Sequence, residues 1–96
     1  MSSIKSIRAK KAQLYKAVHE LDYWEHDEDN WRYLAIRDYD AAITALRAVM
    51  AEYLGYKFAN ALCRDIDEMV RKRYNFDETD ITKAKLMDYD AFIRKV

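Results

Sequence analysis

The chain has 96 residues, with one glycine, no proline and one cysteine. A chain of this length buries roughly 60 to 65% of the surface that it exposes when unfolded, which predicts one small domain over 1–96. Hydrophobic residues make up 51% and charged residues 35%, interleaved throughout, which excludes a disordered or low-complexity chain. Because hairpin turns and phosphate-binding loops need glycine or proline, the composition predicts an all-α fold.

Seventeen Lys and Arg balance seventeen Asp and Glu, so the net charge points to no class of partner. The lone Cys63 cannot form an intramolecular disulfide, and charges interrupt the N-terminal residues where a signal peptide is apolar. The longest weakly charged run, 41–54, contains Arg47 and Glu52 and is too short to cross a bilayer. We therefore expect a cytoplasmic protein with no membrane partner.

The first predicted helix covers about 3–24. Its apolar residues recur at helical spacing in a stripe formed by Ile4, Ile7, Leu14, Val18 and Leu21. Lys11 interrupts this stripe and Arg8 is near it. A homodimer through this helix is therefore not expected.

A polar, acidic stretch follows, and Asp27 is expected to cap a second helix over about 28–53. The carboxylates of Glu28 and Asp29 suit the positive end of the helix dipole. One apolar face of this helix consists of Ile36, Tyr39, Ile43, Leu46, Met50 and Tyr53, and the other of Trp31, Leu34, Ala35, Ala42, Ala45 and Val49. A helix that is apolar on two sides is usually central in its fold.

Gly55 stands where a left-handed helix C-cap is expected, and it precedes a third predicted helix over about 56–73. The apolar stripe of that helix is Phe58, Leu62, Ile66, Met69 and Val70. Asp77 is expected to cap a fourth helix over about 78–95, with Leu86, Tyr89, Ile93 and Val96 as its stripe. The prediction is a small four-helix bundle of two helical hairpins. If Gly55 only bends a continuous helix, at a cost of about 1 kcal/mol relative to alanine, the arrangement has three helices.

A tetrapeptide occurs twice, because Asp38-Tyr39-Asp40-Ala41 matches Asp88-Tyr89-Asp90-Ala91. The surrounding apolar stripes agree at the same offset, which is consistent with an internal duplication of one hairpin. Periodic stripes on core-facing helices also produce such similarity without a common origin. The two aspartates of each copy lie about 200° apart around a helix, so they do not form one catalytic site. The tyrosine between them is expected in the core.

His19 and His26 are the only histidines, and their spacing is not one that zinc or di-iron sites use. All serines lie within residues 2–6, and no pairing of a nucleophile with a base is evident. We expect no catalytic residue, no cofactor and no metal. A small all-α enzyme or metal protein is kept as a third hypothesis.

Residues 1–16 contain five cations and no acid, namely Lys5, Arg8, Lys10, Lys11 and Lys16. Such a cluster suits phosphates or an acidic protein surface. An acidic block over 20–29 lies close to it, and no known nucleic-acid-binding motif is present. Nucleic-acid binding through the basic N-terminal helix is therefore the alternative hypothesis.

Aromatic residues are abundant, with eight Tyr, two Trp and three Phe, and several surround the acidic turn. Exposed Tyr and Trp mark protein interfaces, although packing between helix ends explains Trp24 and Trp31 equally well. We define the acidic aromatic rim as Tyr23, Glu25, Asp27, Glu28, Asp29 and Tyr33. The leading hypothesis is a non-enzymatic inhibitor or regulator that binds a basic surface of another protein through this rim. Phages and other mobile elements often encode such chains.

Overall fold

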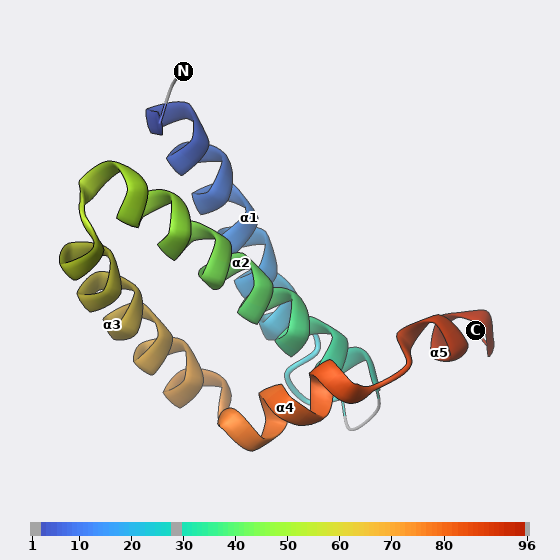
Figure 1. The fold of residues 1–96 in the computed structure, drawn as a ribbon. Helices are drawn as coiled ribbons and strands as arrows, with labels where there is room; N and C mark the ends of the chain where they lie inside the picture. Colours follow the sequence, from blue (N-terminus) through green and yellow to red (C-terminus); the bar gives the residue numbers. More distant parts are fainter. Residues whose placement is uncertain (1–2, 28–29, 96) are drawn as a thin grey trace.

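The computed structural model describes residues 3–27 and 30–95 and confirms the all-α prediction (Figure 1). The helices are α1 (Ser3–Tyr23), α2 (Asn30–Leu54), α3 (Tyr56–Tyr74), α4 (Glu78–Leu86) and α5 (Tyr89–Lys95). Successive long helices α1, α2 and α3 run in alternating directions, so α1 and α3 point the same way. Over the described ranges, no helix is long and apolar enough to cross a membrane.

α2 is the central helix, as predicted, because it packs against α1, α3 and α4. Its core-facing residues are Ile36, Tyr39, Ile43, Leu46 and Met50, and all of them are buried. Tyr53 was expected on the same face but is exposed. It lies in the last turn of α2, where the chain leaves the core at Gly55.

α1 buries the C-terminal part of its predicted stripe and exposes the beginning. Leu14 and Leu21 are buried, and Ile7 and Val18 pack partly against the core. Ile4 is exposed in the first turn of the helix.

α3 packs on the core through the small residues Ala59 and Cys63 and through Ile66 and Val70 of its predicted stripe, which are partly buried. Ala59 and Cys63 are fully buried, which lets the two helices approach closely. The prediction is wrong for Phe58, Leu62 and Met69, which are exposed because they point to the side of this contact. Three large apolar side chains of α3 are thus left on the surface.

Gly55 separates α2 from α3, so the three-helix alternative with a merely bent helix is wrong. Its φ of 99° and ψ of 146° lie outside the left-handed helical region expected for a C-cap. Only glycine adopts this conformation readily. The carbonyl of Gly55 accepts a hydrogen bond of 3.1 Å from the backbone N–H of Ala59, which starts α3 immediately.

The single helix predicted over 78–95 is instead two helices, and the four-helix bundle is not confirmed. Asp77 caps α4 as expected, in a reciprocal capping box with Asp80. Met87 is extended, and the side chain of Asp88 then accepts a 3.1 Å hydrogen bond from the N–H of Ala91 to begin α5. Leu86 and Ile93 are exposed and Val96 lies outside the described residues, so only Tyr89 of the predicted stripe is buried.

The repeated tetrapeptide has a different place in each copy. The first copy lies in the middle of α2, whereas the second begins α5 with an aspartate as its cap. This difference gives the internal duplication no support. Both tyrosines are buried as predicted, and the aspartates of the first copy pair with cations, Asp38 with Arg37 at 3.6 Å and Asp40 with Lys85 at 3.1 Å.

A polar chain connects α2, α3 and α4. The hydroxyl of buried Tyr39 donates a 2.8 Å hydrogen bond to Oδ1 of Asp67, and Oδ2 of Asp67 lies 2.9 Å from Nε of Arg71. Nη2 of Arg71 lies 3.3 Å from Oε1 of Glu78 in α4. Burial, and then the bond to Asp67, raise the pKa of Tyr39 far above its ordinary value of 10.0.

Replacing Gly55 by alanine is expected to lower the free energy of unfolding by about 1–3 kcal/mol, because its φ strains any residue that has a Cβ. No atom lies within 4 Å of the added Cβ, so urea denaturation would report backbone strain alone. Asn75→Gly is the control, since Asn75 adopts the left-handed conformation that glycine accepts, and a change within roughly 0.5 kcal/mol is expected. Equal stability of the two variants would contradict the strain at Gly55.

Folding stability should fall as the pH rises above about 10, because the unfolded chain then loses the proton that folded Tyr39 keeps. Tyr39→Phe should flatten this fall and should also cost roughly 1.5–3 kcal/mol near pH 7, since Asp67 loses a hydrogen bond. Denaturation midpoints measured across this pH range test both effects. Tyr15→Phe, at an exposed ring, should keep the wild-type stability near pH 7. If the stability of Tyr39→Phe falls with rising pH as steeply as that of the wild type, the assignment of this pH dependence to Tyr39 is contradicted.

Candidate functional site

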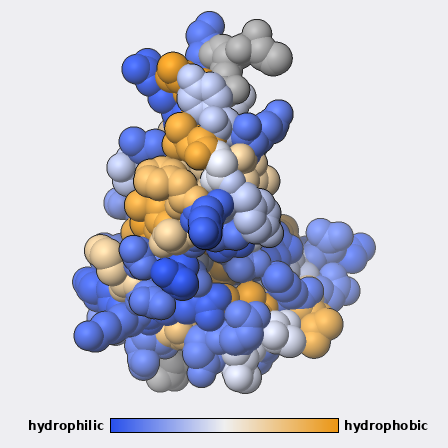
Figure 2. Space-filling view, turned by 60° about the vertical axis from the view of Figure 1, so that its left-hand side comes forward, coloured by the Kyte–Doolittle hydropathy of each residue, from blue (hydrophilic) through white to orange (hydrophobic). Residues whose placement is uncertain are grey.

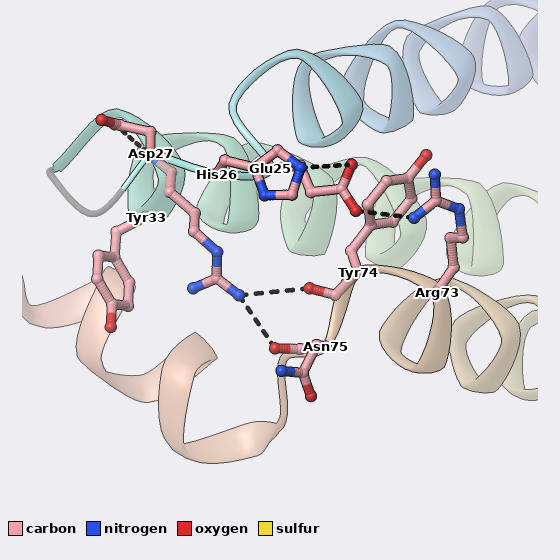
Figure 3. Close-up of a pocket in the computed structure, with 8 residues that line it drawn as sticks. Glu25, His26, Asp27, Tyr33, Arg73, Tyr74 and Asn75 are labelled. Atoms are coloured by element: carbon pink, nitrogen blue, oxygen red, sulfur yellow. Dashed lines mark hydrogen bonds and ion pairs between the residues drawn. The ribbon is translucent and has the colours of Figure 1, made fainter.

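The turn between α1 and α2 lies against the C-terminal end of α3 and encloses a shallow recess of about 530 Å³ (Figure 3). Its wall is formed by the residues that follow α1, by the start of α2 and by the end of α3. The lining residues are Glu25, His26, Asp27, Arg32, Tyr33, Arg73, Tyr74 and Asn75. The recess thus contains three residues of the acidic aromatic rim, together with two arginines that the prediction did not include.

Arg73 connects the end of α3 to the end of α1. Its Nη1 lies 2.8 Å from Oε2 of Glu25 and its Nη2 lies 3.6 Å from Oδ1 of Asp22. The hydroxyl of Tyr74 donates a 3.4 Å hydrogen bond to the same oxygen of Asp22. The carboxylate of Glu25 is therefore already neutralised within the chain.

Arg32 connects the start of α2 to the end of α3. Its Nη2 donates hydrogen bonds of 3.0 Å to the carbonyl of Asn75 and 3.4 Å to that of Tyr74 (Figure 3). A cation at this place suits the negative end of the α3 dipole. Oδ2 of Asp27 accepts a 3.3 Å hydrogen bond from the backbone N–H of Arg32, so Asp27 binds the first turn of α2, which begins at Asn30 and not at the predicted residue 28.

The remaining residues of the acidic aromatic rim are dispersed. The ring of Tyr33 lies 4.5 Å from Nζ of Lys83 in α4. Tyr23 is exposed and does not line the recess. Glu28 and Asp29 lie outside the described residues. Glu25 and Asp27 of the rim thus connect helices, through an ion pair with Arg73 and a hydrogen bond from the backbone of Arg32.

Trp24 and Trp31 stack at 5.5 Å between ring centroids, in agreement with packing between helix ends. Phe92 of α5 packs edge-on against Trp31 at 5.0 Å. Nε1 of Trp24 donates a 3.2 Å hydrogen bond to Oε2 of Glu20. These rings hold α5 against the α1–α2 end, so they belong to the fold and not to an open surface.

The basic residues of α1 do not form one patch. Lys5, Arg8, Lys11 and Lys16 are exposed. Lys10 is half-buried and lies about 140° around the helix from Lys5. Four cations are thus accessible on a wide arc of α1.

Neither histidine belongs to a metal site in the part of the chain that the structure describes, where no three His, Cys, Asp or Glu side chains are arranged to hold an ion. His19 and His26 are both exposed. Cys63 is fully buried, and burial raises the pKa of its thiol, which favours the unreactive neutral form.

A second candidate surface lies between α1 and α3. The ion pair of Asp22 with Arg73 shows which sides of these two helices face each other. At helical spacings before Asp22, α1 places Ile4, Lys11, Tyr15 and Val18 on that side. At helical spacings before Arg73, α3 places Phe58, Leu62, Ile66 and Met69 there.

We call the apolar members of these stripes the α1–α3 face, which consists of Ile4, Tyr15, Val18, Phe58, Leu62, Ile66 and Met69. Val18 and Ile66 form its partly buried base. Met69 is 71% exposed, Tyr15 68% and Phe58 54%. Figure 2 shows hydrophobic side chains gathered in the upper part of the molecule, which contains the N-terminal half of α1 and the α2–α3 turn, while the lower part is mostly hydrophilic.

The sequence contained a signal for the α1–α3 face that our interpretation missed. α3 carries two overlapping apolar stripes, and one helix cannot direct both toward α2. The stripe with small residues is Ala59, Cys63, Ile66 and Val70, and the stripe with large residues is Phe58, Leu62, Ile66 and Met69. The apolar arc of α3 is therefore wider than the contact with α2 requires.

Comparisons with models of protein families, with curated proteins and with solved structures found no match.

Proposed function

We propose that this protein is a non-enzymatic interaction module that binds another protein through the α1–α3 face. The exposure of Phe58, Leu62 and Met69 in one stripe is the observation that carries this proposal. Apolar side chains that are contiguous on a surface mark interaction sites far more strongly than scattered ones. Such side chains also supply the buried anchors that dominate binding energy.

The acidic aromatic rim is proposed as a lesser contact. Its most exposed described side chain is Tyr23, whose ring packs edge-on against Trp24. Glu25 and Asp27 are engaged with Arg73 and with the backbone of Arg32. We retain the proposal of an inhibitor or regulator, which acts by covering a surface of its target. A cytoplasmic location and an origin in a phage or mobile element are part of the same proposal.

Nucleic-acid binding is the second candidate function. It is favoured by the exposed cations Arg8, Lys11 and Lys16 of α1, with the exposed ring of Tyr15 among them. Cations and aromatic rings together bind single strands. The apolar stripe of α3 has no role in this alternative, which separates the two candidates experimentally.

Substitution of the α1–α3 face should release the partner without unfolding the chain. Tagged wild-type protein and the variants Phe58→Asp and Met69→Asp are incubated with lysate, with and without nuclease and at two salt concentrations. We expect one stoichiometric protein on the wild type and at least about tenfold less on both variants, because a charge at a buried anchor opposes binding. Retention is measured by quantitative mass spectrometry.

Leu86→Asp is the matched control, since Leu86 is 82% exposed on α4, away from this face, and its variant should retain the partner fully. Equal retention by all variants would contradict the proposal. Capture of nucleic acid alone, lost at high salt and on Lys11→Glu, would support the second candidate instead.

A further inference from the structure

We infer that the occupant of the α1–α3 face is an amphipathic helix with an acidic edge, supplied by another protein and lying along α1 and α3. This inference rests on the proposed function and specifies the chemistry of the partner. It follows from the shape of the face, from what the chain itself leaves uncovered, and from the charges along the border of the face.

The shape of the α1–α3 face suits a helix. α1 and α3 run in the same direction, and the pair Asp22–Arg73 sets them level at their C-terminal ends. Their apolar side chains therefore follow two parallel lines at helical spacing. A helix binds such a surface through residues i, i+3 or i+4, and i+7 of its own apolar stripe. At 1.5 Å per residue, the line on α1 is about 21 Å long and the line on α3 about 16 Å, so a helix of about 17 residues covers both.

The chain's own C-terminal helices leave this face open. α4 packs on another side of α2, where Lys85 lies 3.1 Å from Asp40 and Lys83 lies over Tyr33. It has 9 residues against 19 in α3, so it is too short to cover that helix. α5 is held at Trp31 by Phe92. The face thus lacks the fourth long helix that its three long helices would need for a complete bundle.

The border of the face is positive. Arg8 on α1 and Lys72 on α3 are exposed beside the apolar stripes, and Lys11 is exposed within the α1 stripe itself. Within the described ranges, no hydrogen bond or ion pair joins the side chain of Arg8 or Lys11 to another residue. Two carboxylates near these stripes already have cationic partners, because Asp22 lies 3.6 Å from Arg73 and Asp65 lies 4.0 Å from Arg64. An occupant with carboxylates toward α1 would pair cations that the fold leaves unpaired.

A second copy of the chain fits this border poorly. A symmetric dimer places the same patch on both sides of the interface, so cations would face cations. Like charges across an interface oppose association. The charge pattern therefore favours a different protein with an acidic helix edge over self-association.

The test uses a phage-displayed library of helices of about 17 residues with a fixed apolar stripe and with Glu, Lys or Gln at the edge positions. The baits are wild type, Lys11→Glu, Lys16→Glu and Leu62→Asp. We expect the wild type to enrich Glu over Lys at one edge by about tenfold. Lys11→Glu should abolish or reverse this preference, whereas Lys16→Glu, the matched control on the outer side of α1, should keep it. Leu62→Asp should remove enrichment altogether.

Three results would overturn the inference. The first is selection without preference between Glu and Lys, the second is a preference that Lys11→Glu leaves unchanged, and the third is no enrichment over Leu62→Asp. A dimer in sedimentation velocity that Met69→Asp dissociates would identify a second copy as the occupant. A lysate partner lost on Phe58→Asp but kept on Lys11→Glu would retain the proposed function and reject the acidic helix.

Discussion

The close contact of α3 with α2 determines most of this structure. Because Ala59 and Cys63 are the residues at the contact, α3 lies near α2 and its large apolar side chains point sideways. The bond from Tyr39 to Asp67 fixes the rotation of α3 about its axis, since a buried hydroxyl needs its partner. Any rotation that buried Phe58 or Met69 would break this bond. The exposed face is thus a direct consequence of a buried polar contact.

Much of the fold was predictable from local pattern. The first three helices begin and end close to their predicted bounds, because apolar periodicity, one glycine and capping aspartates are local signals. Burial of Ile36, Tyr39 and Ile43 followed from the period of α2. The break at Met87 was missed, since Leu86 and Tyr89 are spaced as in a continuous helix and only the side chain of Asp88 marks a new start.

The sites were less predictable, because they depend on contacts between helices distant in the sequence. The residues around Glu25 contain no signal that Arg73 lies 2.8 Å from it. The acidic segment was therefore predicted to be an open surface, whereas it connects two helices. The choice between the two stripes of α3 likewise depends on Tyr39, in another helix. The sequence of a helix shows how much of its circumference is apolar. The helix that packs against it determines which of those apolar residues stay exposed.

The bonds of Arg73 and Arg32 hold α1, α2 and α3 together at one end only. At the opposite end, α1 begins with two turns in which Ile4 is exposed and Ile7 only partly buried. The N-terminal turns of α1 therefore bury less apolar surface than the end of the helix that carries Asp22. Segments with few buried apolar contacts open at a lower free-energy cost than the core, so this end of α1 is expected to adjust more readily to side chains of different size. A ligand of the α1–α3 face would thus meet a fixed surface near Arg73 and a more adjustable one near Ile4.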